Sequence, residues 1–282
     1  MAAFFAWGNT PNSFVVGNGS LLDYQNLPEE YAGKFKSYEW NAMTLRAFYT
    51  GPQGFHWALQ PGNAWSAVAP TTLLPFLKTQ HVVDRPSEGT PRGSCQYVAF
   101  TPKGSAWFAR YSNKTCLWGP PDALPSTFLN VVADLEAHHP RKDECIDFAV
   151  FGAHELLLLR FENGNSGMFL PDDPNLRRRI SPDLVVEVED RLKDGWTLGN
   201  RTALCHFDSA RWFIEWKRGA SAEFKYSAGE GDAASEDLKR ISKVLSGVGN
   251  NATLVADHQA ADLAAANAAF QGQIMINRIL TR

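Results

Sequence analysis

The sequence predicts an all-β fold, namely a five-bladed β-propeller followed by a C-terminal helical tail. Three observations predict it: a unit of aromatic-rich strands recurs five times, turns with glycine or asparagine fall at similar places in the units, and bulky side chains occupy both faces of the strands. Aromatic residues make up 12% of the 282 residues, with nine Trp and eighteen Phe. Such a composition is typical of β-rich proteins whose sheets pack face to face.

The repeated unit consists of an apolar strand, a short polar turn, an aromatic-rich second strand, a tight turn and a third strand. The five copies span residues 2–28, 44–70, 96–121, 146–171 and 202–227. The tight turn falls at Gly19, Gly62, Lys114, Gly164 and Gly219, which are 43 to 55 residues apart. Asn18-Gly19 and Asn163-Gly164 are the strongest hairpin signals, because both residues tolerate the positive φ of a type I′ turn. A fixed period of this length indicates radially repeated sheets.

The strands place large residues on both faces. In the fifth unit Trp212, Ile214 and Trp216 share one face, while Phe213 and Glu215 share the other. Sheets covered on both sides need such strands. The first strands carry a column of small or medium residues that would suit a crowded centre: Ala6, Ala47, Ala99, Val150 and His206. The alternative fold is a β-sandwich of similar hairpins.

Proline-led segments lie between the units, and the sequence leaves their structure open. One covers residues 122–129, and another begins at Ser181-Pro182 and continues as VVEVEDRL. Ser before Pro with acidic residues in the first turn favours a short helix. The β-branched run favours an outer strand instead.

The chain divides into the five-unit region, residues 1–228, and a linker with C-terminal helices, residues 229–282. The second part begins with the small, acidic stretch AGEGDAASED, and Ser235 is expected to cap a helix. Its apolar stripe is Leu238, Ile241, Leu245 and Val248. A second, alanine-rich helix is expected from about Thr253 to Leu280. These helices pack on the body of the protein or assemble copies of the chain through residues 235–280 as a homo-oligomer.

Charge and cysteine content limit the classes of partner. The net charge is −3 with a pI near 6.2, so no global field attracts nucleic acid or an acidic membrane. The four cysteines form no CxxC or zinc-type spacing. The N-terminus lacks a basic start, and no run is long and apolar enough for a membrane span. We therefore expect a cytoplasmic protein that binds neither nucleic acid nor membrane.

Two groups of residues are candidates for ligand binding. Arg110, Arg160 and Glu215 occupy equivalent positions in three successive units, each one residue before an aromatic. We expect them to form either ion pairs between the repeated sheets or a set of polar groups that binds a ligand. The tryptophans Trp65, Trp118 and Trp196 could stack on a sugar or another flat apolar face, or pack in the core.

The sequence offers little to support catalysis or a cofactor. It contains no GxSxG, HExxH, Walker or Rossmann pattern, and we expect no cofactor. His138-His139 with Asp143 and Glu144 could bind a metal, but adjacent histidines usually point apart, so we expect no metal. His56 and His206 would need a hydrogen-bonding partner to act as an acid or base.

The rhythm of units three to five, with a small turn, a Trp/Phe-rich strand, a glycine turn and an aromatic strand, resembles tachylectin-type and tectonin-type propellers. The resemblance covers roughly residues 1–228 and implies a lectin whose ligands lie between blades. We therefore expect binding of a carbohydrate or another small molecule. Two alternatives are an enzyme, such as a cyclase or isomerase with an apolar pocket, and a protein-interaction scaffold that assembles through its C-terminal helix.

Overall fold

The structure is a computed structural model that describes residues 3–37, 40–60, 65–78, 94–138 and 145–245, together with the backbone of one further strand, residues 252–256. Each of the first four units folds into its own three-stranded antiparallel sheet. Their strands are β1 (Phe4–Trp7), β2 (Phe14–Gly17) and β3 (Leu22–Gln25); β4 (Ala47–Thr50), β5 (His56–Leu59) and β6 (Trp65–Val68); β7 (Cys95–Phe100), β8 (Trp107–Tyr111) and β9 (Cys116–Gly119); and β10 (Ile146–Phe151), β11 (Leu157–Phe161) and β12 (Ser166–Phe169).

The fifth sheet is larger. It contains β13 (Thr197–Leu198), β14 (Ala203–Leu204), β15 (Arg211–Arg218), β16 (Ser221–Ala228) and β17 (Ala252–Ala256). Its order is β13-β15-β16-β17, and β14 pairs with β15 beside β13. β17 runs parallel to β16, whereas the other pairs in this sheet are antiparallel.

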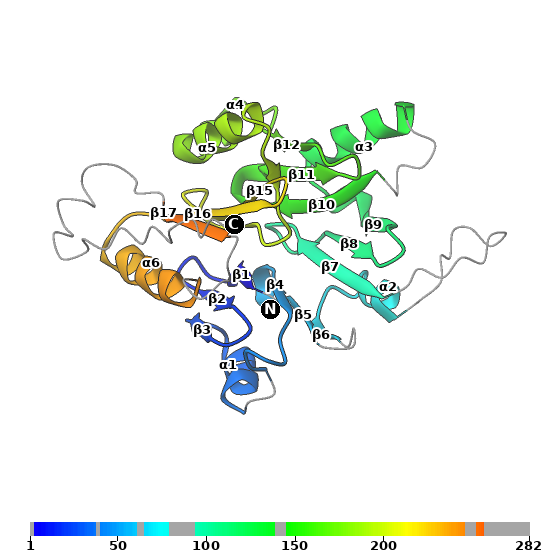
Figure 1. Ribbon diagram of the computed structural model, residues 1–282. Helices are drawn as coiled ribbons and strands as arrows, with labels where there is room; N and C mark the ends of the chain where they lie inside the picture. The colour runs from blue at the N-terminus through cyan, green and yellow to red at the C-terminus, as the bar shows by residue number, and fades with distance from the viewer. Residues whose placement is uncertain are drawn as a thin grey trace.

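Six α-helices in the described residues lie around the outside of the group of sheets (Figure 1). They are α1 (Glu29–Lys36), α2 (Leu74–Lys78), α3 (Ser126–His138), α4 (Pro174–Arg177), α5 (Pro182–Lys193) and α6 (Asp232–Leu245). Among the described residues there are also three short 3₁₀ turns, η1 (Pro52–Gly54), η3 (Pro121–Ala123) and η5 (Ala153–Glu155).

The prediction of an all-β five-bladed propeller is wrong. The described residues form small separate sheets, none of which closes on itself, and a substantial part of the chain is helical. The physical reason lies in the segments between the units. A propeller blade has four strands, but among the described residues the first four units supply three each, and helices occupy the described parts of the sequence that would have provided outer strands.

For the segments between the units the sequence left open a helix or an outer strand. In the described parts of these segments the structure has helices. The VVEV run lies within α5, which Pro182 begins at its first position. Proline fits there because the first N–H groups of a helix have no intrahelical partner. Leu184 and Val188, four residues apart, are buried on one side of α5. Helical spacing of the apolar residues thus prevails over the β preference of valine.

Turns lie at the predicted positions wherever the structure describes them, but the type I′ conformation expected at Asn18-Gly19 and Asn163-Gly164 is not found, because neither asparagine has a positive φ. Gly19, Gly164 and Gly219 have φ of +85°, +86° and +59°, and Lys114 has φ of +72°. The left-handed region favours glycine, so Lys114 is the least expected of the four. Gly62 lies outside the described residues.

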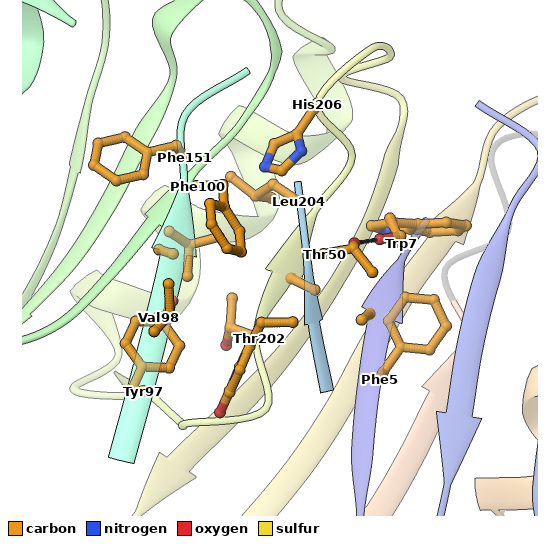
Figure 2. A pocket seen from close by; sticks show the side chains of 15 residues that line it. Phe5, Trp7, Thr50, Tyr97, Val98, Phe100, Phe151, Thr202, Leu204 and His206 are labelled. Atoms are coloured by element: carbon orange, nitrogen blue, oxygen red, sulfur yellow. Dashed lines mark hydrogen bonds between the residues drawn. The ribbon is translucent and has the colours of Figure 1, made fainter. Parts of the chain in front are cut away.

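The first strands of the five units meet at a narrow central cavity (Figure 2). β1 contacts β4 and β14, β4 contacts β7, and β10 contacts both β7 and β14. The cavity measures about 40 Å³, which is room for one or two water molecules. The predicted column of small residues is found here, since Ala6, Ala99, Val150 and His206 line the cavity, whereas Ala47 does not. Burial lowers the pKa of His206 to about 4, although a hydrogen bond to the Phe100 backbone opposes this.

The C-terminal helix joins the first sheet to the fifth. α6 begins at Asp232, three residues before the predicted cap, and buries Leu238, Ile241 and Leu245 against these sheets. The apolar stripe of residues 235–245 therefore packs against the sheets of the same chain. It is less exposed for contact with another copy in the expected homo-oligomer. The second helix is contradicted at residues 253–256, where the chain pairs with the free edge of β16 as β17. The rest of it lies outside the described residues.

Two charged residues of α6 make the connection. Arg240 donates from Nε to Asp23 Oδ2 at 2.8 Å, and its guanidinium lies 5.2 Å from the centre of the Phe14 ring. Asp237 is fully buried and accepts hydrogen bonds from Gln25 of the first sheet and Arg211 of the fifth, at 2.5 and 3.2 Å. One carboxylate thus connects the first sheet to the fifth.

Removing the Asp237 carboxylate is expected to destabilise the fold by about 3 kcal/mol, because the buried Arg211 guanidinium loses its closest charged partner. Urea unfolding of Asp237→Ala measures this. Lys239→Ala, on the exposed side of α6, is the matched control and should change the unfolding free energy by less than about 0.5 kcal/mol. Equal effects of the two substitutions would show that the helix is not anchored through Asp237.

Candidate functional site

Two β-bulges shape the site. In the third sheet Cys95 pairs with Tyr111 and Tyr97 with Arg110, so Gln96 is an extra residue on β7. In the fourth sheet Ile146 pairs with Phe161 and Phe148 with Arg160, which makes Asp147 the extra residue on β10. A bulge redirects the side chain that it carries. Both Gln96 and Asp147 line one pocket.

This pocket lies between the third and fourth sheets and has a volume of about 440 Å³; we call it the inter-sheet pocket. Its polar and charged lining residues are Gln96, Arg110, Ser112, Lys114, Asp147, Arg160, Glu162 and Asn200. Its aromatic lining residues are Tyr49, Tyr97, Tyr111 and Phe148. A cavity of this size is in the range that holds small-molecule ligands.

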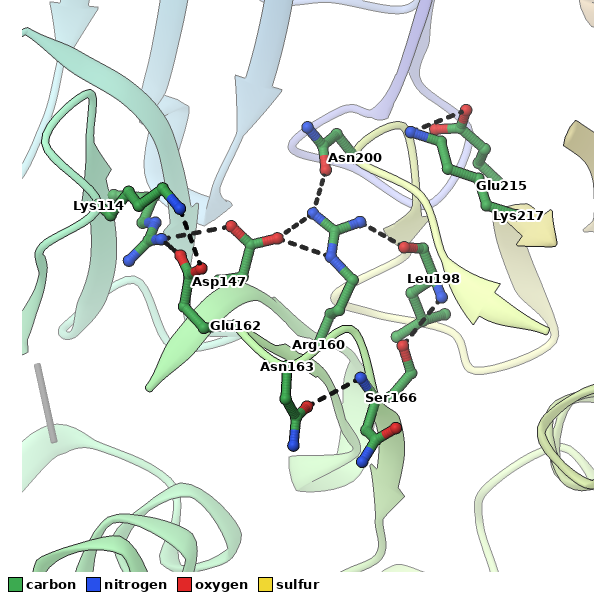
Figure 3. A network of polar contacts seen from close by, with 12 residues as sticks. Lys114, Asp147, Arg160, Glu162, Asn163, Ser166, Leu198, Asn200, Glu215 and Lys217 are labelled. Carbon is green, nitrogen blue, oxygen red and sulfur yellow. Dashed lines mark hydrogen bonds and ion pairs between the residues drawn. The ribbon is translucent and has the colours of Figure 1, made fainter. Parts of the chain in front are cut away.

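Arg160 lies at the centre of the polar network (Figure 3). Its Nε donates to Asp147 Oδ2 at 2.7 Å, and its Nη2 also contacts this oxygen. The same guanidinium donates to Asn200 Oδ1 at 2.5 Å and to the backbone carbonyl of Leu198. Because Leu198 and Asn200 belong to or follow β13, Arg160 connects the fourth sheet to the fifth.

Arg110 connects the third sheet to the fourth. Its Nη2 lies 3.4 Å from Asp147 Oδ1 and forms a second, shorter ion pair with Glu162. Lys114 Nζ is 3.7 Å from the other oxygen of Glu162. Two arginines from neighbouring sheets therefore share the carboxylate of Asp147, and ion pairing at such close range fixes the positions of all three side chains.

The guanidinium of Arg110 is almost completely buried, with 7% of the side chain exposed. Its Nη1 has no hydrogen-bond partner in the part of the chain that the structure describes. Burial lowers the pKa of Arg110 below the usual value for arginine, while Cys116 and Asp147 raise it. A buried guanidinium is stable only with charged partners, and the Asp147 and Glu162 carboxylates are these partners.

Aromatic rings form the other part of the pocket wall. Tyr97 stands directly across the strand pair from Arg110, and Phe148 stands across from Arg160. Tyr97 contacts both Tyr49 and Phe148, with ring centres 4.6 Å apart in each case. Burial raises the pKa of Tyr49 and of Tyr97 above that of a free phenol. Both rings are therefore neutral at physiological pH.

The structure brings together two of the six predicted ligand-binding residues. Arg110 and Arg160 line the inter-sheet pocket, but Glu215 does not. Glu215 is buried in the fifth sheet, where its carboxylate accepts from the Arg201 backbone at 3.0 Å and from the Arg201 guanidinium at 2.5 Å. All three side chains form ion pairs, but only Arg110 pairs across two sheets, with Asp147 and Glu162. Arg160 pairs with Asp147 of its own sheet, and Glu215 pairs with Arg201 of its own unit.

None of the three predicted tryptophans lines the inter-sheet pocket. Trp65 is half-buried against the apolar cluster of the second and third sheets. Trp118 packs edge-on against Phe128, with ring centres 5.6 Å apart. Trp196 is buried, and the guanidinium groups of Arg191 and Arg218 lie 5.0 and 4.6 Å from its ring centre. Stacking of these rings on a ligand stays a prediction.

Sequence reasoning missed Asp147, Tyr97 and Phe148. A signal for them exists in the alignment of the first strands, CQYVAF in the third unit and IDFAVF in the fourth. Both place a polar residue before an aromatic at the same position. In a regular strand with strict alternation, this polar side chain would point to the apolar face. A polar residue at such a position indicates a β-bulge.

His56, which lies in the core, is a second candidate functional residue. His56 contacts Tyr31 and Trp40, with ring centres 4.4 and 5.2 Å apart. Both nitrogens of His56, the Tyr31 hydroxyl and the Trp40 indole nitrogen are buried without a hydrogen-bond partner among the described residues. Burial lowers the pKa of His56 to about 4. The positive charge of Lys34 also lowers this pKa, whereas the Gly54 backbone raises it. His139, Asp143 and Glu144 of the conceivable metal site lie outside the described residues.

No family model and no curated protein matches the chain. The resemblance to tachylectin-type and tectonin-type proteins is therefore untested and stays a prediction. Within the described residues, no helix has the length and apolar character that crossing a membrane requires. In the same residues, no three His, Cys, Asp or Glu side chains gather where they could hold a metal ion.

Gly199→Ala is expected to destabilise the protein by about 3 kcal/mol. A Cβ at this position would lie 2.2 Å from the carboxylate of Glu215 and would displace it from Arg201, and disrupting a buried ion pair carries a cost of this size. Thermal or urea unfolding tests the expectation. Gly33→Ala in α1, where a Cβ meets nothing within 4 Å, should be neutral or slightly stabilising.

The stability of the protein should fall as the pH falls from about 6.5 to about 4, in part because of His56. The unfolded chain gains a proton on this residue near pH 6.5, whereas the folded protein gains it only near pH 4. The loss due to His56 between pH 7 and pH 4.5 is about 2.5 kcal/mol. Urea unfolding at the two pH values should therefore show a smaller difference for His56→Gln than for the wild type. An unchanged difference would mean that His56 titrates normally.

Proposed function

We propose that the protein binds a small polyhydroxylated ligand of the carbohydrate class in the inter-sheet pocket. The observation that carries the proposal is one cavity of about 440 Å³ that charged hydrogen-bonding groups line and aromatic rings border. Of these rings, Tyr49 is partly exposed, whereas Tyr97, Tyr111 and Phe148 are buried. Sugars present hydroxyl groups along their edges and apolar C–H groups on their faces. A site for them therefore needs donors and acceptors at fixed positions together with a ring surface.

The ion pairs support this function because they fix the polar groups before a ligand arrives. Asp147 is held between Arg110 and Arg160, and Arg160 is also held by Asn200 and the Leu198 carbonyl. Groups that are already ordered lose little conformational entropy on binding. Charged donors and acceptors also form stronger hydrogen bonds to hydroxyl groups than neutral ones do.

The two tyrosines Tyr49 and Tyr97 of the pocket are suited to contact a ligand and not to transfer protons near neutral pH. The pKa values of Tyr49 and Tyr97 are shifted upward, away from neutrality. Proton transfer near neutral pH is most efficient for groups whose pKa is close to the working pH. With a raised pKa these phenols stay protonated, and the Tyr97 hydroxyl already donates to the Ala149 carbonyl, so both side chains line the pocket as neutral rings.

We also propose a reducing compartment such as the cytoplasm for the protein. All four cysteines are free thiols, and Cys95, Cys116 and Cys205 are buried. Burial raises the pKa of Cys95 to about 12 and also raises that of Cys205. Free thiols are typical of proteins in compartments that keep cysteine reduced.

The experiment that tests the carbohydrate proposal is a glycan array followed by calorimetric titration of the best ligand. Arg160→Ala and Asn200→Ala should each weaken binding about tenfold, because each removes a polar group of the pocket. The matched control, Arg178→Ala, removes an exposed arginine distant in sequence from the pocket residues and should change the affinity less than about twofold.

Thermal unfolding of each variant separates loss of binding from loss of folding. Asn200 is exposed, so Asn200→Ala should unfold at nearly the wild-type temperature even if Arg160→Ala does not. Absence of binding to any sugar would contradict the proposed function. Wild-type affinity in both pocket variants would place the ligand elsewhere on the protein.

A further inference from the structure

A second pocket lies on the opposite face of the fourth sheet. Arg160 and Phe161 are consecutive on β11, so their side chains point to opposite faces. Arg160 lines the inter-sheet pocket, and Phe161 lines a cavity of about 550 Å³ between the sheet and α3. We call this cavity the α3 groove. It shares no lining residue with the inter-sheet pocket.

The floor of the α3 groove is apolar. Val131 and Leu135 contribute from α3, and Phe161, Met168, Phe169 and Leu170 contribute from the sheet and the residue after β12. The four residues from the sheet side are only partly buried. Apolar side chains left partly open at the bottom of a concave surface favour an apolar ligand, since covering them releases water.

The polar residues of the groove carry an excess of negative charge. Asp134 and Asp172 contribute two carboxylates, and Arg177 contributes one guanidinium. Neither carboxylate has a lysine or arginine partner within the described residues. Asp172 Oδ2 accepts from Asn130 at 3.1 Å, and Asp134 Oδ1 lies 3.4 Å from Nδ1 of the neighbouring His138. The Arg177 guanidinium is only partly available to these carboxylates, because its Nε donates to the Pro171 carbonyl at 3.1 Å.

We propose that the α3 groove is a binding site for a small amphipathic amine, that is, a flat apolar group bearing a positively charged nitrogen. The apolar group covers Phe161, Met168 and Leu135, and the ammonium lies near Asp134 and Asp172. This site is independent of the inter-sheet pocket and of the carbohydrate proposal, since different side chains form it.

The test uses three indoles that differ in charge only at the end of a short chain: tryptamine, the neutral alcohol tryptophol and the anion indole-3-acetate. Calorimetry or ligand-observed NMR on the full chain should show tryptamine binding about threefold to fivefold more tightly than tryptophol, the upper part of the range expected for exposed charge pairs. Indole-3-acetate should bind most weakly. Equal affinity for tryptamine and tryptophol, or no binding of any of the three, would overturn the proposal.

Two variants assign the binding to the groove. The double variant Asp134→Asn, Asp172→Asn should reduce the preference for tryptamine over tryptophol to less than about twofold. Its matched control, Asp122→Asn with Asp183→Asn, removes two exposed carboxylates outside the groove and should keep the preference. Met168→Lys should weaken binding of all three indoles. If Met168→Lys fails to fold, the carboxylate variants decide. A preference that persists in Asp134→Asn, Asp172→Asn places the amine elsewhere.

Discussion

The structure depends on the fact that no sheet in the chain can cover its own faces. β1, β2 and β5 are buried along their whole length, and every residue of β8 is buried as well. A three-stranded sheet with apolar side chains on both faces is unstable alone in water. Each unit must therefore pack against its neighbours or against a helix, and the first strands do so around the narrow central cavity.

The same constraint explains where the polar groups gather. Along most contacts between neighbouring sheets the packing is aromatic, as between Tyr49 and Tyr97. Between the third and fourth sheets the bulge at Asp147 brings a carboxylate into the contact, and Arg110 and Arg160 pair with it. The inter-sheet pocket lies beside these ion pairs, and the Tyr97 and Phe148 rings pack next to it. The α3 groove arises differently, because α3 covers the opposite face of the fourth sheet incompletely.

Part of this arrangement could be predicted from the sequence, because it rests on local chemistry. Asn-Gly pairs mark the positions of hairpin turns, and Gly19 and Gly164 adopt a positive φ there, although Asn18 and Asn163 do not. The equivalence of Arg110 and Arg160 was visible in the alignment of the units. Asp147 was not predicted, because its role depends on a one-residue irregularity in strand pairing. The failure at residues 253–256 has a similar origin, since the strand β17 exists only because β16 offers a free edge.

The sequence by itself determined the number of sheet-forming units, the position of most hairpins and the charge-bearing positions of the second strands, since each of these follows from residues close together in the chain. Only the tertiary structure decided that helices occupy the segments between units and that Asp147 serves two arginines. It also decided that Glu215 is buried away from the inter-sheet pocket while Phe161 opens onto the α3 groove. These outcomes depend on which surfaces meet across the chain, and contacts between distant residues have no local signature.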